Sequence, residues 1–329
     1  MAVSSRRRLV SAVFAGVLGA ASCAATAVAQ EKFPSRPIQV IATFGAGGGA
    51  DLMGRQMARL AEPILGVALP VSNVAGASGT AGLTRLLTNS PDGYTVATLI
   101  ALSVSAWASN ISTQKPDDFT FVAMTQDSPS MLFVATSSPH KDIKAFLEHA
   151  KANPGKLKVA TSGYGTQDDI TLIYLEKLGY KTTNVPFARP AERYAAPIGG
   201  HVDAIYEEPG DVAQFVKAGQ LRALVTFDDV RHFAFKDVPS SKELGMQISD
   251  LPNFRTLAVP AATPADRVKV LAAAFDKVLD SPEWKKYCTE TYTCTKKLTP
   301  EQTKAKVKAF YETVQGYQKR FPDMKKGTK

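Results

Sequence analysis

Residues that ligate metals or pair as disulfides are scarce in this chain, which has three cysteines and four histidines among its 329 residues. The histidines, at positions 140, 149, 201 and 232, stand alone in the sequence and show none of the spacings of a metal site. None of them lies near a cysteine. We therefore expect neither a bound metal nor another cofactor.

Signatures of catalytic chemistry are also missing. The sequence has no Gly-x-Ser-x-Gly nucleophile elbow, and no Gly-Lys-Ser/Thr follows its glycine-rich segments. Two acidic pairs, at positions 168–169 and 207–208, consist of adjacent residues, whose side chains would point to opposite faces of a strand. These absences favour a binding protein over an enzyme.

Long apolar runs are absent after residue 29, so we expect a soluble mature protein. The N-terminus itself has three arginines at positions 6–8, an apolar run over residues 9–21 and the small residues Ala27-Val28-Ala29. This pattern predicts a cleaved signal peptide over residues 1–29 and a periplasmic location. An uncleaved anchor is the alternative, but the run is too short to span a bilayer.

Removal of the signal peptide would take Cys23 and leave Cys288 and Cys294, six residues apart. In an oxidising compartment this spacing predicts a local disulfide, with two free thiols as the alternative.

Charge of one sign is not concentrated along the chain. The formal net charge is +9, and three of the positive charges belong to the arginines of the predicted signal peptide. Lysine and arginine are otherwise scattered, apart from a lysine-rich C-terminal segment, so a nucleic-acid surface is not expected.

Short apolar runs rich in β-branched residues alternate with amphipathic segments of helical period, which predicts an α/β fold with mainly parallel sheets. The strand candidates are residues 38–44, 67–73, 95–100, 157–161, 184–187, 202–206 and 221–225. Two later helices are expected after Thr263-Pro264 and Thr299-Pro300, where a capping hydroxyl precedes a proline.

The length of the chain favours two lobes, but no low-complexity linker divides them. We therefore expect chain crossovers, near residues 126–131 and 253–256. The predicted division is residues 30–128 plus 254–329 for the first lobe and residues 129–253 for the second.

Three glycine-rich loops follow predicted strands and open predicted helices, at residues 44–51, 73–82 and 161–168. Glycine lets the backbone approach a ligand closely, and the N–H groups at a helix start favour an anion. Loops of this kind at the carboxyl ends of parallel strands form a binding crevice. For the first loop, a tight turn without a ligand is the alternative.

The first loop also satisfies a dinucleotide fingerprint, Gly45-x-Gly47-x-x-Ala50, which would indicate an enzyme. The next predicted strand, however, ends in Asn73, where a ribose-binding carboxylate would be expected. The nicotinamide-enzyme hypothesis fails at this position.

The chain resembles the substrate-binding receptors of tripartite tricarboxylate transporters, also called the Bug family of extracytoplasmic solute receptors. Besides the three glycine loops, the motifs that carry the resemblance are Pro34-Ser35-Arg36-Pro37-Ile38, Pro91-Asp92-Gly93-Tyr94-Thr95, Asn153-Pro154-Gly155-Lys156-Leu157, Gly199-Gly200-His201-Val202-Asp203 and Lys217-Ala218-Gly219-Gln220-Leu221. They cover essentially the whole mature chain. The resemblance implies a type II periplasmic binding protein fold, with a cleft between two lobes that closes on a small carboxylate.

The resemblance also implies which residues line the cleft. They are Phe44, Ala46, Gly48 and Gly49 of the first loop, Ala77, Ser78, Gly79 and Thr80 of the second, Ser103 and Ser105 after the third strand, Thr161, Ser162, Gly163, Gly165 and Thr166 of the third loop, and Asp203 at the rear.

Charged residues near these loops could add contacts. Arg189 and Arg255 could meet a second carboxylate of the ligand, and Asp168 or Glu207 could meet an amino group. The alternative for each is a solvated surface charge.

The resulting hypothesis is a periplasmic receptor that hands a small organic carboxylate to the membrane permease subunits of a transporter. We expect it to act as a monomer, without cofactor and without chemistry. The alternatives are a ligand sensor that feeds a two-component system and a periplasmic enzyme.

Overall fold

The computed structural model describes residues 32–293 and 297–322, and all of their helices and strands lie in the unit Pro34–Lys329. The predicted signal peptide falls outside the described residues, as does Cys294. Cys288 is buried on helix α9 (Pro282–Glu290). The proposed disulfide therefore stays a prediction.

The first sheet has five strands in the order β2-β1-β3-β10-β4. Their bounds are β1 Gln39–Ala42, β2 Val71–Asn73, β3 Thr95–Ile100, β4 Phe119–Ser128 and β10 Asn253–Pro260. β1 pairs in parallel with β2 and β3, whereas β10 runs antiparallel to both β3 and β4. Four of the five strands therefore point the same way.

The second sheet repeats this plan in the order β7-β6-β8-β5-β9. Its strands are β5 Met131–Ala135, β6 Lys158–Thr161, β7 Thr183–Pro186, β8 Ala204–Glu207 and β9 Leu221–Thr226. β6 pairs in parallel with β7 and β8, and β5 runs antiparallel to β8 and β9. The chain thus passes to the second sheet between β4 and β5 and returns between β9 and β10, which is a two-lobed α/β architecture.

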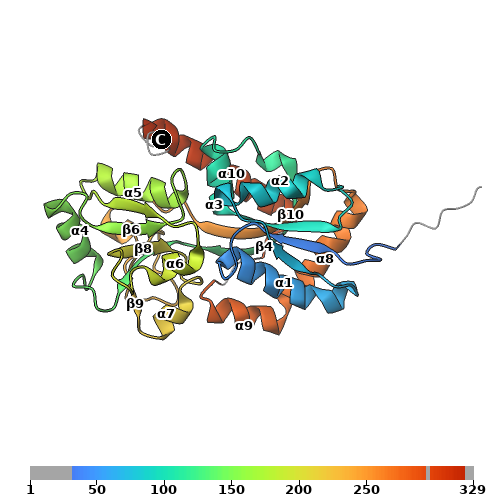
Figure 1. The fold of residues 1–329 in the computed structure, drawn as a ribbon, viewed down its shortest axis with the longest axis horizontal. Coiled ribbons are helices and arrows are strands. Elements are labelled where there is room, and N and C mark those ends of the chain that lie inside the picture. The colour runs from blue at the N-terminus through green and yellow to red at the C-terminus, as the bar shows by residue number, and fades with distance from the viewer. Residues whose placement is uncertain (1–31, 294–296, 323–329) are drawn as a thin grey trace, which may run out of the picture. The chain divides into compact units, whose positions relative to one another are not determined.

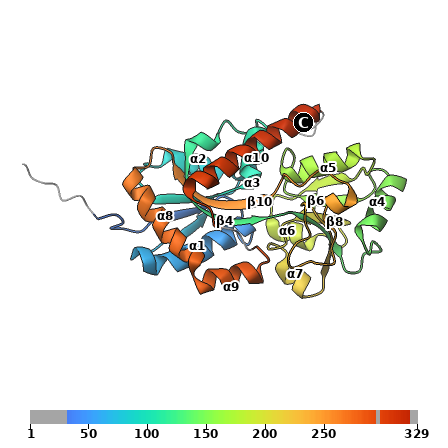
Figure 2. The ribbon, with the colours of Figure 1, turned by 180° about the vertical axis from the view of Figure 1, so that it is seen from behind.

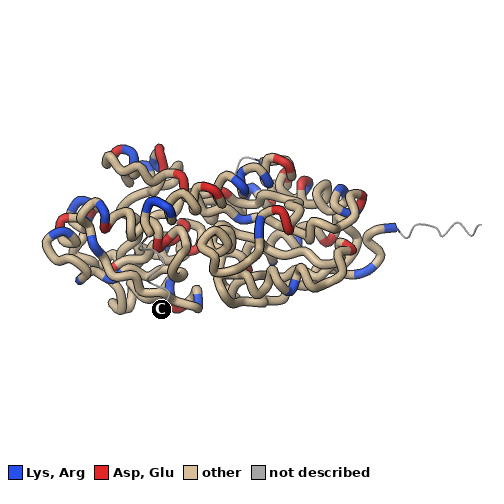
Figure 3. The backbone as a smooth tube through the Cα atoms, turned by 90° about the horizontal axis from the view of Figure 1, so that it is seen from above, with Lys and Arg blue, Asp and Glu red and all other residues tan. Residues whose placement is uncertain are grey.

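Helices cover both faces of each sheet (Figures 1 and 2). On the first sheet, α1 (Gly49–Leu65), α8 (Ala265–Asp280) and α9 lie on one face, and α2 (Thr80–Thr88), α3 (Ala101–Ala108) and α10 (Pro300–Arg320) lie on the other. The second sheet carries α4 (Ile143–Ala152), α5 (Gln167–Lys177), α6 (Pro190–Ala195) and α7 (Ala213–Lys217). Residues of both charge signs are interspersed along the chain (Figure 3).

The two predicted helix starts have different outcomes. Thr299 caps α10 as predicted, since its Oγ1 accepts a hydrogen bond from the Gln302 N–H at 3.2 Å, and the Gln302 side chain accepts from the Thr299 N–H in return. The prediction for α8 is wrong: Pro264 is the N-cap residue itself, and no side chain caps the helix.

All seven predicted strands are present, with bounds that differ by a few residues at most of their ends. Strands β4, β5 and β10 were not predicted, although the crossovers were placed at their ends. β5 and β10 lie inside their sheets and β4 lies at an edge, and all three are buried along almost their whole length, so polar residues do not mark an exposed face in their sequences.

Candidate functional site

The three glycine loops follow β1, β2 and β6, each at the carboxyl end of its strand. The first and third lead directly into α1 and α5, and the second leads through a short 3₁₀ turn, Ala77–Gly79, into α2. The first N–H groups of a helix have no partner within the helix. The loops therefore direct helix N-termini from both sheets toward one region.

An aspartate holds the first loop in shape. Asp51 Oδ2 accepts a hydrogen bond from the N–H of Gly47 at 3.0 Å, and its Oδ1 accepts from Nδ2 of Asn73 at 2.8 Å. Asn73, on the adjacent strand β2, also donates to the carbonyl oxygen of Phe44 at 3.0 Å. Asn73, which stands where a dinucleotide-binding protein would have a carboxylate, thus stabilises the first loop.

The third loop has the same brace. Asp169 Oδ2 accepts from the N–H of Gly165 at 2.9 Å, and its Oδ1 accepts from Nδ2 of Asn184, on the adjacent strand β7, at 2.8 Å. Burial raises the pKa of Asp169, and these two hydrogen bonds oppose that shift. In both sheets, an aspartate of the helix and an asparagine of the adjacent strand therefore hold the loop in the same way.

The second loop has a strained backbone. Ala77 and Ser78 adopt φ angles of 45° and 54°, between Gly76 at 140° and Gly79 at 86°. Positive φ at non-glycine residues costs about 1–3 kcal/mol each and clusters at functional sites. The carbonyl oxygen of Ser78 accepts a hydrogen bond from Ser103 Oγ at 3.0 Å, which fixes the loop against the start of α3.

The first and second loops are in contact. A Cβ atom placed on Gly79 would lie 2.6 Å from both Phe44 Cε2 and Ser103 Oγ. The predicted residues Phe44, Gly79 and Ser103 are therefore side by side, and glycine is required for their packing.

The loops of one sheet also contact elements of the other. Ser105 Oγ, on α3, donates to Gln167 Oε1 at 3.2 Å, and Ser109 Oγ donates to the carbonyl oxygen of Gly165 at 2.6 Å. A Cβ atom on Gly48 would lie 2.9 Å from Cγ of Pro190, the first residue of α6. Each contact thus joins one predicted residue, Ser105, Gly165 or Gly48, to a residue of the other sheet that was not predicted.

Asp168 is buried and directed at its own loop. Its carboxylate accepts hydrogen bonds from the N–H of Ser162 at 2.8 Å and from the Ser162 hydroxyl. Burial raises the pKa of Asp168, against the effect of these bonds. The side chain is therefore not a surface charge, and it occupies two donors of the third loop.

Arg189 and Asp203 lie apart from these contacts. The Arg189 side chain is 80% exposed and pairs with Glu192 at 2.9 Å, which agrees with the surface alternative. Asp203 precedes β8, and its Oδ2 accepts from the N–H of Lys158 at the start of β6. The structure thus places Asp203 at the amino ends of these strands, whereas the third loop follows their carboxyl ends.

Arg255 is a buried bridge between the two sheets and not a surface charge. Its Nη1 donates to Gln126 Oε1 at 2.8 Å, and its Nη2 pairs with Asp211 Oδ1 at 2.6 Å and with the Glu208 carboxylate. A Cβ atom on Gly49 would overlap the Arg255 guanidinium and the Asp211 carboxylate. The ion pair therefore lies directly against the start of α1.

A second buried pair lies beside this bridge. Arg193, on α6, donates from Nε and Nη2 to Glu207 Oε2, at 2.9 and 2.6 Å. Burial raises the pKa of Glu207 to about 7 and that of Glu208 to about 8. Since the single charge of Arg255 cannot balance both of its acidic partners, Glu208 retains its proton in the neutral range.

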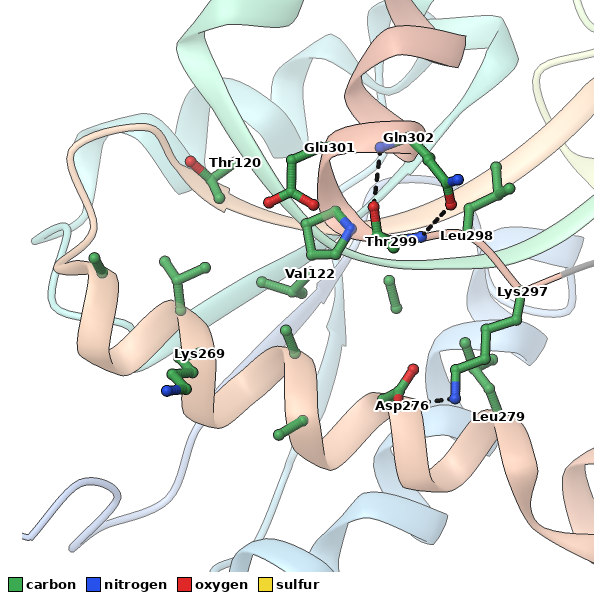
Figure 4. A pocket seen from close by; sticks show the side chains of 16 residues that line it. Thr120, Val122, Lys269, Asp276, Leu279, Lys297, Leu298, Thr299, Glu301 and Gln302 are labelled. Atoms are coloured by element: carbon green, nitrogen blue, oxygen red, sulfur yellow. Dashed lines mark hydrogen bonds and ion pairs between the residues drawn. The ribbon is translucent and has the colours of Figure 1, made fainter.

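One cavity, of about 280 Å³, touches the first loop at Gly49 and is bounded by the start of α1, by α9 and by the Arg255–Asp211 pair. Another, of about 720 Å³, lies between α8, β4 and the first turn of α10 (Figure 4). Its edge carries the Thr299 cap and the ion pair of Lys297 with Asp276 at 2.8 Å. No residue of the glycine loops lines this second cavity.

Sequence reasoning missed Gln167, Asp211 and Arg193. Gln167 lies within the third loop, at the first position of α5, and this position was the available signal. The partners of the two arginines are far from them in sequence, so no local pattern could have paired them. Within the described residues, no group of three or more potential ligands could hold a metal ion, and none of the helices has the length and apolar character needed to cross a bilayer.

The comparisons with known proteins agree with this geometry. The family model described as "Tripartite tricarboxylate transporter family receptor" matches residues 53–307. The chain is 33% identical over 274 residues to the "UPF0065 protein in gbd 5'region" of Cupriavidus necator, with 82% of each chain covered.

Two solved structures are also similar. The periplasmic binding protein BugD matches with 25% identity and a TM-score of 0.80, over 88% of this chain and 98% of BugD. MatC of Rhodopseudomonas palustris, with bound malate, matches with 25% identity and a TM-score of 0.75, over 89% and 100% of the two chains.

Proposed function

This chain belongs to the tripartite tricarboxylate transporter receptor family, and from that premise we propose that it is a periplasmic receptor that captures a small carboxylate. The observation that carries the proposal is that glycine loops follow the carboxyl ends of strands in both sheets, and that the first and third loops each contact elements of the opposite sheet. Open α/β sheets bind ligands at that edge. The malate bound to MatC supports a carboxylate as the ligand class.

The loops would bind the carboxylate mainly through the backbone. Helix α1 has 17 residues and begins within the first loop, so its positive end and free N–H groups favour an anion. Gly48 and Gly49 are buried and have no Cβ atom, so the backbone can approach a ligand closely at these two residues. In the second loop, Ala77 and Ser78 adopt the left-handed conformation, and the carbonyl oxygen of Ser78 accepts a hydrogen bond from Ser103 Oγ.

Capture would proceed by closure of two lobes. We assign residues 30–128 and 254–329 to one lobe and 129–253 to the other, with the crossovers as hinges. The bonds from Ser105 to Gln167 and from Ser109 to Gly165 would then form on closure. Arg255 would hold the lobes together near the hinge.

The remaining parts of the proposal concern the cellular role. After removal of residues 1–29, the receptor would deliver its ligand to the membrane permease subunits of a tripartite transporter. It would act as a monomer, without a cofactor and without transforming the ligand. Mass spectrometry of candidate ligands after incubation with the protein tests the last point, because turnover would appear as a new mass.

A thermal-shift panel of mono-, di- and tricarboxylates that includes malate tests the binding function. A ligand that binds only the folded state must stabilise it, by about 2.7 kcal/mol at 100 times its dissociation constant. We expect at least one carboxylate to raise the melting temperature, with the corresponding amides as uncharged controls. The proposed function is wrong if no carboxylate in the panel does so.

A further inference from the structure

Gln167 joins the two lobes within the proposed site. It is the first residue of α5 and lies within the third glycine-rich loop, and its side chain is fully buried. Its Oε1 accepts a hydrogen bond from Ser105 Oγ at 3.2 Å, and Ser105 belongs to α3 on the first sheet. One end of the amide is therefore held by the opposite lobe.

The other end of the same amide has no partner. In the part of the chain that the structure describes, Gln167 Nε2 is buried and makes no hydrogen bond. An unpaired buried donor is unfavourable, because it has lost its hydrogen bond to water without gaining another. Such a group indicates a missing acceptor at this position.

Neighbouring hydroxyl groups already use their own protons. Thr166 Oγ1 donates to the carbonyl oxygen of Gly163 at 2.8 Å, and Thr171 Oγ1 donates to that of Gln167 at 2.9 Å. Ser103 Oγ, on the facing helix, donates to Ser78. Among these polar side chains between the loops, the Gln167 amide is the donor that still lacks an acceptor.

We propose that Gln167 Nε2 donates a hydrogen bond to a carboxylate oxygen of the captured solute, and that Ser105 orients this amide from the opposite lobe. This inference rests on the proposed function. Because Ser105 and Gln167 belong to different lobes, the donor is fully oriented only when the lobes are together. Gln167 would thus link ligand recognition to closure.

Two substitutions of Gln167 test the contact by isothermal titration, with malate or, if it gives a larger thermal shift with wild type, succinate or citrate. Gln167→Glu keeps the shape but replaces the donor by an acceptor, and Gln167→Met removes the polar atoms at similar volume. We expect affinity to fall about ten- to a hundredfold in both, as for loss of a hydrogen bond to a charged group. The melting temperature of ligand-free Gln167→Met should change little, since the variant removes the unpaired Nε2 donor but also removes Oε1, the acceptor of the Ser105 hydroxyl.

A comparison of Ser105→Ala with Ser109→Ala distinguishes orientation of the Gln167 amide from a general effect on closure of the lobes. Ser105→Ala should weaken binding in the wild-type background and have no further effect in Gln167→Met. Ser109→Ala removes a different contact between the lobes, the one to Gly165, and should weaken binding by the same factor in both backgrounds. Equal, additive effects of the two serine substitutions would contradict the orienting role of Ser105.

The possible failures are distinguishable. If no carboxylate raises the melting temperature of the wild-type protein, the proposed function fails and the inference fails with it. If the wild type binds and both Gln167 variants bind equally well, only the inference is overturned. A lower melting temperature of ligand-free Gln167→Met with unchanged affinity would assign Gln167 a structural role instead.

Discussion

Nη2 of Arg255 lies 2.6 Å from Oδ1 of Asp211, so a buried ion pair joins strand β10 of the first sheet to the segment after β8 of the second. The pair is screened from water, since the two side chains are 3% and 7% exposed. Asp211 also accepts a hydrogen bond from the hydroxyl of Tyr194 at 3.0 Å, which fixes its orientation. The ion pair therefore stabilises the protein by holding the two sheets together.

Removal of Arg255 should be strongly destabilising. Arg255→Met leaves the buried Asp211 carboxylate without its counter-charge, a change that typically costs about 3–5 kcal/mol. Urea unfolding followed by circular dichroism measures the loss. Arg189→Met is the matched control, because its exposed guanidinium pairs only with Glu192 among the described residues, and it should leave stability nearly unchanged. Equal effects of the two substitutions would contradict the bridging role.

Stability should fall as the pH rises through the neutral range. Burial raises the pKa of Glu207 to about 7 and of Glu208 to about 8, so the folded protein holds protons that the unfolded chain releases near pH 4.5. Where the folded state binds more protons, a rise in pH favours unfolding. The contribution of these residues is thus complete below pH 4.5 and lost by about pH 8.

Melting temperatures between pH 6.5 and 9 check this dependence. Below that window the lowered pKa values of His140 and His232, both caused mainly by burial, act in the opposite direction. Glu208→Gln, which cannot ionise, should flatten the decline. A melting temperature that rises from pH 6.5 to 8.5 in the wild type would refute the assignment.

Gly48→Asp should abolish carboxylate binding. The added side chain would place a negative charge at the start of α1, and its Cβ would lie 2.9 Å from Pro190 Cγ and 3.2 Å from the carbonyl oxygen of Gly45. The negative charge would repel a carboxylate ligand, and the contacts of the Cβ atom would obstruct closure of the lobes. Isothermal titration with malate, or the best carboxylate of the thermal-shift panel, measures the loss. The control is Gly316→Asp on the exposed face of α10, which meets no atom within 4 Å; unchanged affinity of the Gly48 variant would exclude the first loop from the site.

Asp169→Asn should destabilise the third loop. The carboxylate accepts hydrogen bonds from both Gly165 and Asn184, and an amide offers only one acceptor oxygen. One buried donor therefore loses its partner, at a cost of about 1–3 kcal/mol. Thermal unfolding measures the change, and Asp266→Asn, at an exposed position, serves as the control. If both substitutions have the same small effect, the brace at Asp169 does not stabilise the loop.

The sequence alone determined the α/β class, the two-lobed plan and the position of the glycine loops. These properties follow from local patterns, because the period of apolar residues distinguishes strand from helix and glycine marks the places of close backbone approach. The family resemblance, carried by motifs in a fixed order, is confirmed by the match over residues 53–307.

Only the tertiary structure decided what the charged and polar residues near the loops do. Arg255 pairs with Asp211, 44 positions away, and Ser105 with Gln167, 62 positions away. The antiparallel pairing of strands β4, β5 and β10 depends on the return of the chain between the sheets. Such pairings depend on distances in space that no local period encodes. The sequence therefore predicted the loops of the proposed site, whereas the packing of the two sheets determined which side chains form buried ion pairs and left Gln167 Nε2 without a partner among the described residues.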